Sequence, residues 1–314
     1  MRIFNGWNVA GHSKMKKRVL ITGIEGFTGR YVRKEFQNSG WEVYGFGGSE
    51  KQKENYFKAN LLDIESLKNV VKEVKPHAVV HLAGIAYAAH LHAIDFYNIH
   101  VLGTLNFLSV LEEHGENIEK VLLASSANVY GNTEAGVFSE SAPLKPFNDY
   151  GVSKLAMEYM AWLWREKLPI VIARPFNYSG VGQTQNFLLP KLVWHFQQKK
   201  SEVLLGNIDV ARDFSDVRSV AYAYRRLIET PGSKGAVNVC SGQAFTIRQV
   251  LGVLQDLAGY SIEIKVNQSL IREGEVRILY GSHERLSGLI GGYLPPPLNE
   301  TLHWMLEAKE NDGL

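Results

Sequence analysis

A phenol and an ammonium stand four residues apart in the segment YGVSK, at Tyr150 and Lys154. If the segment is helical, both side chains lie on one face, with β-carbons roughly 5–6 Å apart. A phenol ordinarily titrates near ~10, and a nearby positive charge that favours the phenolate would make it a usable acid or base at neutral pH. The pair therefore predicts acid/base catalysis, with an ordinary helix-surface pair as the alternative.

The segment TGIEGFTGRY contains Gly23, Gly26 and Gly29 at GxxGxxG spacing, between the apolar run RVLIT and a helical stretch. Glycines permit a tight turn and let backbone amides approach a pyrophosphate, which then sits at the positive end of the helix. The position between strand and helix is the context that such a motif needs. We predict a dinucleotide site here, with a glycine-rich packing turn as the alternative.

Residues after the second strand bear on the choice of nicotinamide cofactor. In NAD sites an acidic residue usually closes that strand and binds the adenosine ribose. In YGFGGSEKQK the expected position holds glycine, Gly47 or Gly48, and Glu50 lies slightly late. Three cations could instead meet a 2′-phosphate: Lys51, Lys53 and Arg30. The sequence thus favours NADP(H), with NAD(H) as the alternative.

Composition limits the class of protein. A chain of 314 residues with 45% hydrophobic residues is long enough for a large core and two lobes. Lys and Arg (34) nearly balance Asp and Glu (32), so no basic field for nucleic acid is expected. The single cysteine, Cys240, fits a reducing compartment, and its apolar run GAVNVC predicts a buried thiol.

The chain carries no pattern that predicts secretion or membrane insertion. Residues 1–14 show neither periodicity nor the apolar core of a signal peptide, and we interpret them as a leader of unknown role. The longest apolar stretch, residues 78–91, is too short to cross a bilayer and contains two histidines. We expect a soluble, cytoplasmic protein, and we expect no metal.

Short apolar runs alternate with amphipathic stretches from Arg18 to about Arg174, which is the pattern of βαβ units. Because the runs are apolar on both faces, they predict strands of a parallel, doubly wound, Rossmann-type α/β sheet. The expected strands are residues 18–22, 41–46, 77–83, 120–125 and 169–174. The expected helices between them are residues 26–39, 64–74, 96–114 and 149–167.

After Pro175 the sequence changes to loops rich in Gly, Asn and Gln. Helical stretches interrupt these loops at residues 188–198, 217–228, 247–257 and 298–308. We predict a dinucleotide-binding domain over residues 15–175, with later strands able to return to its sheet. Residues 176–314 are expected to form a smaller α/β lobe.

The segment LLASSANVYG places Ser125 and Ser126 at the carboxyl end of a strand, where ligands bind in such sheets. The order of glycine loop, serine and then YxxxK resembles the short-chain dehydrogenase/reductase superfamily, and SSANVYG together with the chain length resembles its extended, nucleotide-sugar-modifying branch. The resemblance implies that Tyr150 is the acid/base and that Ser126 hydrogen-bonds the substrate oxygen. It also implies that Lys154 holds the nicotinamide ribose and lowers the pKa of Tyr150.

The resemblance extends to the cofactor site. The glycine motif carries Phe27 beside Arg30, and the segment HLAG, with Leu82 and Ala83, resembles the family stretch that passes beneath the cofactor. Asp63, in LLDIES, is the expected adenine contact, although a helix N-cap is an equally good interpretation. In HVLGT the chain departs from the family, since His100 replaces the usual asparagine.

The later lobe also resembles the family. In ARPFNYSGVGQ, Asn177 matches a contact to the sugar diphosphate, and ARDFSDVRSV supplies Arg212. The string IREGEV supplies Arg272 and Glu275 as further substrate contacts. Guanidinium forks bind phosphate bidentately, although either arginine alone could be in a surface ion pair. The resemblance thus implies that this lobe binds a nucleotide sugar.

The two residues after Ser126 narrow the reaction. Nucleotide-sugar 4,6-dehydratases place an acid pair there, whereas this chain has Ala127 and Asn128, so elimination is not expected. The strings RPFNYSGVGQ, GNIDVARDFSDVR, VNVCSG and GSHERL most resemble GDP-4-keto-6-deoxymannose reductases. This resemblance implies NAD(P)H-dependent reduction of a 4-keto sugar to GDP-rhamnose or its 4-epimer. We also expect a homodimer. A dTDP-4-keto-6-deoxyhexose reductase, a nucleotide-sugar 4-epimerase and an inactive cofactor-binding regulator are the alternatives.

Overall fold

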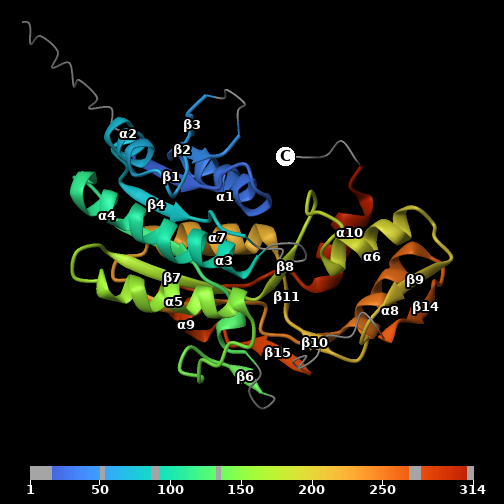
Figure 1. Ribbon diagram of the computed structural model, residues 1–314. Coiled ribbons are helices and arrows are strands. Elements are labelled where there is room, and N and C mark those ends of the chain that lie inside the picture. The colour runs from blue at the N-terminus through green and yellow to red at the C-terminus, as the bar shows by residue number, and fades with distance from the viewer. Residues whose placement is uncertain (1–15, 50–53, 86–91, 132–135, 269–276, 310–314) are drawn as a thin grey trace, which may run out of the picture.

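A computed structural model describes residues 16–49, 54–85, 92–131, 136–268 and 277–309. A twisted sheet covered by helices on both faces makes up the larger lobe (Figure 1). A smaller group of helices and strands lies beside the carboxyl ends of the sheet strands (Figure 1). It includes α6 (Leu188–Gln197), α8 (Ile247–Ala258), β9 (Glu202–Leu205) and β14 (Glu263–Val266). None of the described helices is long and apolar enough to span a membrane.

The larger lobe is the Rossmann-type fold predicted from the sequence. Among the described residues, seven strands pair in the order β12-β7-β5-β4-β1-β2-β3, and every neighbouring pair is parallel. The strands are β1 Arg18–Thr22, β2 Glu42–Gly47, β3 Tyr56–Lys58, β4 Ala78–His81, β5 Lys120–Ala124, β7 Ile170–Pro175 and β12 Gly235–Val239. All five predicted strands lie in this sheet, which confirms the expected doubly wound architecture.

Side chains alternate between the two faces of the sheet. Val19 and Ile21 pack in one core, whereas Leu20, between them, packs in the core on the other face. The first core is covered by α1 Phe27–Asn38, α7 Val217–Glu229 and α9 Glu284–Ile290. The second is covered by α2 Ile64–Val74, α4 Thr104–His114 and α5 Asp149–Leu163. Burial on both faces explains why the strand sequences are apolar without alternation.

The helix expected over residues 96–114 is divided in the structure. A short helix α3, Ala93–Tyr97, runs into a π-helical stretch η1, Asn98–Gly103, and then into α4 without a break. A π-turn shifts the phase of the side chains along a helix, and such turns are frequent at functional sites. The shift occurs at the stretch that contains His100, which is 1% exposed.

The smaller lobe has a core of its own. It is formed by α6 Leu188–Gln197, α8 Ile247–Ala258 and α10 Leu298–Glu307, together with the parallel pair β9 Glu202–Leu205 and β14 Glu263–Val266. Leu192, Leu254 and Leu302 are fully buried at its centre. Each helix of this lobe was expected from the sequence, to within one or two residues at either end.

The later chain also returns to the large sheet. β12 pairs with β7, and α7 packs against α1 on one face. Cys240 follows β12 directly and is fully buried, as expected, and burial raises the pKa of its thiol. Short strands connect the lobes, in the pairings β13-β10-β15-β6 and β11-β8. They are β6 Val137–Phe138, β8 Asn177–Ser179, β10 Ala211–Arg212, β11 Phe214–Asp216, β13 Phe245–Thr246 and β15 Ile278–Gly281.

The strand order reverses between β1 and β4: later strands are added beside β4 on one side and beside β1 on the other. In sheets of this kind, ligands bind in the crevice at the carboxyl ends of the two strands where the order reverses. The Thr22 hydroxyl, at the end of β1, accepts from the backbone N–H groups of Leu82 (3.0 Å) and Ala83 (2.8 Å). Because both lone pairs of the Thr22 oxygen are used, the Thr22 hydroxyl donates its hydrogen to Nδ1 of His81 (2.8 Å). Nε2 of His81 therefore carries the ring proton and donates to Thr104 (3.0 Å).

This hydroxyl network decides where β4 ends. The sequence predicts a strand through Ala83, but β4 ends at His81 because the next two N–H groups bond a side chain rather than a neighbouring strand. Burial and the charge of Lys154 lower the pKa of His81 to about 3, so the ring stays neutral. The turn after β4 is thus fixed against the glycine motif after β1.

Candidate active site

Ser126 and Tyr150 meet at the carboxyl end of β5. Ser126 begins the 3-10 helix η2, Ala127–Val129, directly after that strand. Tyr150 lies in the first turn of α5, whose N-cap, Asn148, accepts from the N–H of Gly151 (2.8 Å). The Ser126 side chain lies close enough to the Tyr150 phenol to lower its pKa. Two segments that are 24 positions apart are therefore brought together at the side chains expected to do the chemistry.

Asn128 orients the Ser126 hydroxyl, a role that sequence reasoning missed. The Ser126 oxygen accepts from the Asn128 backbone N–H (3.2 Å) and from its side-chain amide (3.0 Å). A hydroxyl has two lone pairs and one proton, so the proton of Ser126 remains available to a further acceptor. A donor to the phenol oxygen favours the phenolate, in agreement with the lowering effect of Ser126 on the pKa of Tyr150.

Burial has the larger effect on the Tyr150 phenol. It raises the pKa to about 12, against the smaller lowering effect of Ser126. The rings of Phe96 and His100 pack edge-on against Tyr150, at centroid distances of 5.9 Å and 5.6 Å. Tyr150 therefore holds its proton at neutral pH, and the lowering of its pKa by Lys154 stays a prediction.

Lys154 lies one turn further along α5 and is 6% exposed. Its Nζ donates to the carbonyl oxygen of Ala124, at the end of β5 (2.8 Å). Burial lowers the pKa of this ammonium to about 8, and the charge of Glu158 raises it. The ammonium is thus held beside the site by a strand carbonyl and a buried carboxylate.

Glu158 belongs to a buried polar network behind the site. Its carboxylate binds the guanidinium of Arg174 on β7 (2.6 Å) and accepts from the Ser125 hydroxyl. Arg174 also donates to the Tyr130 hydroxyl (3.1 Å), which donates in turn to Asn238 on β12 (2.6 Å). The network connects α5 to the end of β5, to β7 and to β12, and so fixes α5 on the sheet.

The glycine motif fits a bound pyrophosphate. Gly23 has a φ of +67°, and a methyl group on it would lie 3.2 Å from the backbone of Ala83. Gly26 is the N-cap of α1 and supplies no side-chain acceptor to the first-turn N–H groups, which are therefore available to an anion. A methyl group on Gly29 would overlap the carbonyl oxygen of Gly23. The third glycine therefore permits the close packing of helix on strand.

Other predicted cofactor residues lie around this motif. Leu82 and Ala83 follow β4 at the crevice, held by Thr22. The Phe27 ring stacks on Tyr178, with centroids 6.2 Å apart, and Arg30 donates to the Gly182 carbonyl (3.3 Å). Both contacts join the start of α1 to the segment that follows β7.

Asp63 and the end of β2 are the remaining places where the sequence predicts cofactor contacts. Asp63 caps α2 and accepts from the N–H groups of Glu65 (3.1 Å) and Ser66 (3.2 Å), so the N-cap interpretation is confirmed. Its contact to adenine stays a prediction. At the end of β2, a methyl group on Gly48 would have no atom within 4 Å. Glu50, Lys51 and Lys53 lie outside the described residues.

The predicted substrate residues lie on the short strands between the lobes. Asn177 is exposed on β8, and its amide donates to the Asp213 carbonyl (3.3 Å). Arg212 is half-buried on β10 and donates to the carbonyl of Ala211 (2.9 Å). β11 pairs with β8, so the chain around Arg212 runs close to Asn177. Arg272 and Glu275 lie outside the described residues.

Tyr178 is a second residue that sequence reasoning missed. Its hydroxyl is 2.7 Å from that of Thr28, next to the glycine motif, and it raises the pKa of Tyr150 by proximity. It directly follows Asn177 in the string RPFNYSGVGQ, which is the one signal that could have pointed to it. The side chain bridges the dinucleotide loop and the expected substrate side.

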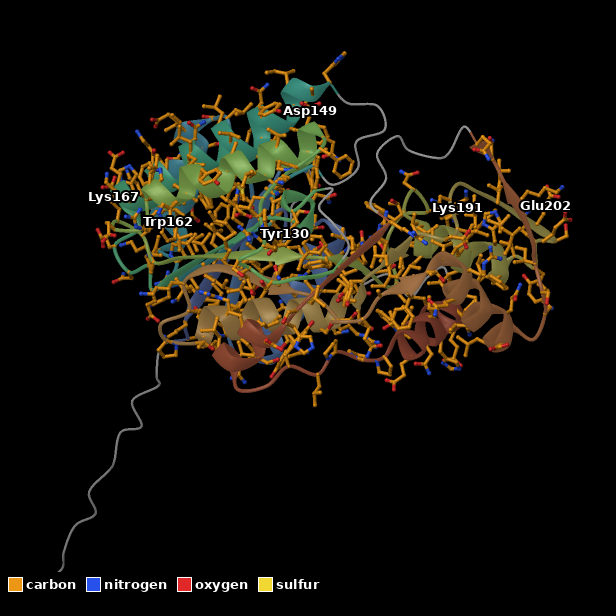
Figure 2. The ribbon with its side chains drawn as sticks, turned by 90° about the horizontal axis from the view of Figure 1, so that it is seen from below. Tyr130, Asp149, Trp162, Lys167, Lys191 and Glu202 are labelled. Atoms are coloured by element: carbon orange, nitrogen blue, oxygen red, sulfur yellow. The ribbon has the colours of Figure 1, made fainter. Side chains whose placement is uncertain are left out.

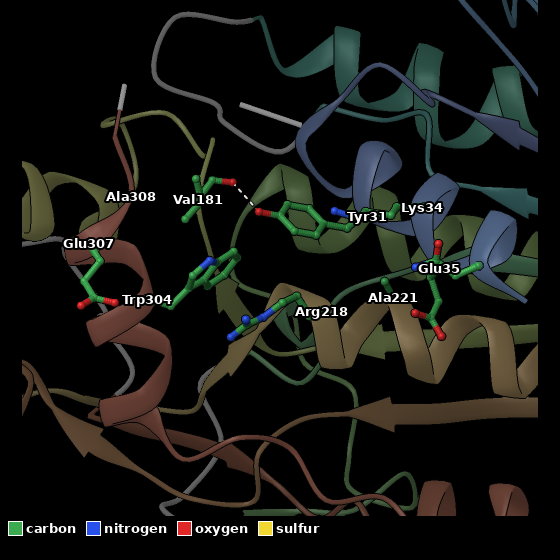
Figure 3. Close-up of a pocket in the computed structure, with 10 residues that line it drawn as sticks. Tyr31, Lys34, Glu35, Val181, Arg218, Ala221, Trp304, Glu307 and Ala308 are labelled. Atoms are coloured by element: carbon green, nitrogen blue, oxygen red, sulfur yellow. Dashed lines mark hydrogen bonds between the residues drawn. The ribbon is translucent and has the colours of Figure 1, made fainter. Parts of the chain in front are cut away.

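A pocket of about 560 Å³ lies away from this group, between α1, α7 and α10 (Figure 3). Tyr31 donates to the Val181 carbonyl (2.7 Å) on its wall, and the Arg218 guanidinium lies 3.8 Å above the ring of Trp304. Asp216 binds both Arg218 (2.6 Å) and Thr301 (2.9 Å). The pocket lies where α10 is fixed to the larger lobe, rather than beside Tyr150.

Known proteins resemble the chain over most of its length. A GDP-6-deoxy-D-mannose reductase from Pseudomonas aeruginosa is 35% identical over 312 residues, which cover 95% of this chain and 98% of the relative. A GDP-6-deoxy-D-talose 4-dehydrogenase from Aggregatibacter actinomycetemcomitans is 31% identical over 277 residues, which cover 87% of this chain and 91% of the relative.

Solved structures resemble it closely too. A candidate epimerase from Burkholderia cenocepacia J2315 is 43% identical, with a TM-score of 0.88 and coverage of 93% of this chain and 97% of the other. RMD from Pseudomonas aeruginosa, in complex with NADPH, is 32% identical, with a TM-score of 0.82 and the same coverage.

The family comparison covers the dinucleotide motif, the catalytic helix and the strands between them. The model of the NAD dependent epimerase/dehydratase family matches residues 19–240. This range includes Ser126 and Tyr150, whose side chains lie close together, and the buried Lys154. The chain therefore belongs to the NAD dependent epimerase/dehydratase family, the extended short-chain dehydrogenase/reductases that its sequence resembles.

Proposed function

We propose that this protein uses NADPH to reduce the C4 ketone of a GDP-linked 4-keto-6-deoxyhexose. The substrate we favour is GDP-4-keto-6-deoxymannose, reduced to GDP-rhamnose or its C4 epimer. One observation carries the proposal: the half-buried Tyr150 phenol, whose pKa is raised, lies beside Ser126 at the carboxyl end of the sheet. The names of the two curated relatives, which refer to GDP-6-deoxy-D-mannose and GDP-6-deoxy-D-talose, support the GDP-linked class.

The raised pKa of Tyr150 supports a reaction in which this residue acts first as an acid. Reduction of a ketone needs an acid that gives a proton to the developing alkoxide, whereas oxidation of an alcohol needs a base. A phenol whose pKa is raised to about 12 holds its proton and is therefore suited to reduction. Ser126, directed by Asn128, places a second hydroxyl beside the same oxygen.

The nicotinamide, when bound, supplies the hydride that reduces the carbonyl carbon. The residues that would hold the dinucleotide are Gly23, Gly26 and Gly29 at the pyrophosphate, Leu82 and Ala83 beneath it, and Lys154 at the ribose. Phe27, Arg30 and Asp63 complete the set that we propose. Lys154 also supplies the positive charge that stabilises the phenolate left on Tyr150 after its proton has moved.

Elimination is a poorer fit to these side chains. A dehydratase needs an acid pair after the catalytic hydroxyl, whereas Ala127 is 3% exposed and Asn128 is bonded to Ser126. Asn177, Arg212, Arg272 and Glu275 are proposed to bind the sugar diphosphate. A dTDP-linked substrate and a 4-epimerase remain the alternatives, and the assembled set of Ser126, Tyr150 and Lys154 argues against an inactive regulator.

We also propose the arrangement in which the protein works. The dinucleotide-binding domain of residues 15–175, completed by later strands, and the nucleotide-sugar lobe of residues 176–314 would enclose the substrate between them. We place the enzyme in the cytoplasm. A homodimer is supported by an exposed apolar face of α5, which lies on the outside of the larger lobe (Figure 2). On that face Tyr159 is 64%, Trp162 52% and Leu163 77% exposed.

The first experiment tests the catalytic assignment. Purified protein with NADPH is offered separate GDP-linked and dTDP-linked 4-keto-6-deoxy sugars, and absorbance of the reduced cofactor is followed. Tyr150→Phe should lower kcat by roughly 10²–10⁴-fold, the usual cost of removing a positioned proton donor. NADPH affinity should remain, because the ring and helix remain. Near-normal turnover by this variant would show that YGVSK is not the catalytic helix.

The second prediction concerns pH. Because burial lowers the pKa of Lys154 to about 8, kcat should fall as pH rises through about 8 and the ammonium loses its proton. Glu158 raises this pKa, so Glu158→Gln should move the fall to lower pH. Glu166→Gln, at an exposed position beyond α5, is the matched control. A pH profile of Glu158→Gln that coincides with that of the wild type would contradict this account of Lys154.

The third prediction concerns the cofactor. No acidic side chain stands at Gly47 or Gly48 to bind a free ribose 2′-hydroxyl, and the place at Gly48 is open. We expect a lower Kd for NADPH than for NADH in a fluorescence titration. Equal or reversed values would mean that Glu50 or another group supplies the acid.

The fourth prediction concerns assembly. Leu163→Glu would place a charge on the exposed apolar face of α5 and should shift the protein from dimer to monomer in sedimentation velocity. Leu294→Glu is the matched control, since Leu294 is 96% exposed in the loop before α10. A monomeric wild type, or a dimer that survives Leu163→Glu, would remove this face as the interface.

A further inference from the structure

His100 is a buried histidine that the proposed chemistry does not use. It lies on the π-helical stretch η1 and is 1% exposed. Three functional segments surround it: the turn after β4, the first turn of α5 and Lys154. A methyl group on Gly84 would lie 3.0 Å from its Nε2 and 3.4 Å from the Nζ of Lys154, so imidazole and ammonium border the same small space.

Hydrogen-bond accounting fixes the state of the His100 ring. The backbone N–H of Ile85 donates to Nε2 (3.1 Å), so this nitrogen is the acceptor. Nδ1 therefore carries the proton and donates to the Ser153 hydroxyl (2.9 Å). Ser153 donates in turn to the backbone carbonyl of Tyr150 (2.8 Å). An amide N–H cannot reverse its role, so the whole chain from Ile85 to Tyr150 has one direction.

The surroundings keep His100 neutral. The titratable and charged groups near it are Tyr150 and Lys154 on α5 and His81 on β4, and the Phe96 ring covers another side. Burial, the charge of Lys154 and the proximity of His81 lower the pKa of His100 to about 2. The neutral ring therefore holds its hydrogen-bond partners in place and does not act as an acid.

We propose that His100 is a positioning residue that sets the catalytic helix against the segment beneath the cofactor. Nε2 holds Ile85, which directly follows the segment of Leu82 to Gly84. Nδ1 holds Ser153 and, through it, the turn that carries Tyr150. The inference rests on the proposed function, in which Tyr150 gives a proton to a substrate held over that cofactor.

Two variants separate the two hydrogen bonds of His100, the bond from Ile85 to Nε2 and the bond from Nδ1 to Ser153. The amide nitrogen of asparagine is about as far from the backbone as Nδ1 of histidine. His100→Asn can therefore keep a donor to Ser153 but loses the acceptor for Ile85. The amide oxygen of glutamine is about as far from the backbone as Nε2 of histidine. His100→Gln can therefore accept from Ile85 but loses the donor to Ser153. Ser153→Ala removes the hydrogen bonds that connect His100 to the first turn of α5, with a smaller change in side-chain volume. It serves as the test if a His100 variant does not fold.

The measurements are kcat at saturating NADPH, the Kd of NADPH and the melting temperature. We expect His100→Gln and Ser153→Ala to lower kcat by about tenfold, because small displacements of a reacting group cost rate, with the wild-type Kd of NADPH. We expect His100→Asn to raise the Kd of NADPH and to keep more of kcat than His100→Gln. His303→Gln, at a half-exposed histidine of α10, is the control.

Equal effects of His100→Asn and His100→Gln on both parameters would overturn the proposal. So would variants that change only the melting temperature, since that is the result of a merely structural role. If wild-type protein reduces none of the sugars, the proposed function fails independently. The Kd of NADPH then decides: a rise in His100→Asn alone supports the positioning role, and equal values in both variants overturn it.

Discussion

The buried ammonium of Lys154 is the constraint on which the site depends. A charge removed from water is costly unless groups around it compensate. Here a strand carbonyl accepts from Nζ, and Glu158, itself paired with Arg174, supplies the nearby negative charge. The same charge helps to keep His81 and His100 neutral. The ends of β4 and β5 and the start of α5 are therefore fixed together.

The side chains around Tyr150 suit a reaction that needs one proton donor. Its phenol has a raised pKa, Ser126 lies beside it, and Asn128, at the position where the sequence comparison expects an acid in a dehydratase, is bonded to Ser126. Such a site can give one proton to an alkoxide beside a nicotinamide, whereas elimination asks for a second acid or base. Catalysis in this account is therefore mainly a matter of positioning, which explains the number of buried hydrogen bonds behind the site.

The sequence predicted most of what depends on local patterns. Apolar runs such as RVLIT marked the strands, and glycines between a strand and a helix marked the dinucleotide turn. It did not predict the role of Asn128, because the contact of its amide with Ser126 depends on the shape of the turn after β5. It did not predict the role of Tyr178, because this side chain contacts Thr28 in a segment distant in the chain. The sequence left open that a later strand could return to the sheet, and the structure shows β12 beside β7. His100 was visible as a departure from the family pattern, but its fixed tautomer required the positions of Ile85 and Ser153.

The central claim is net hydride transfer to C4 of the sugar. The most direct measurement uses NADPH carrying deuterium in its transferable C4 position, with a GDP-linked 4-keto-6-deoxyhexose, and determines both the NADPH oxidised and the position of the label. If the hydride moves from the nicotinamide to C4 of the sugar, one NADPH is oxidised per sugar reduced and deuterium appears at C4 of the product. Interconversion of C4 epimers without net oxidation of NADPH, or a product without deuterium at C4, would contradict it.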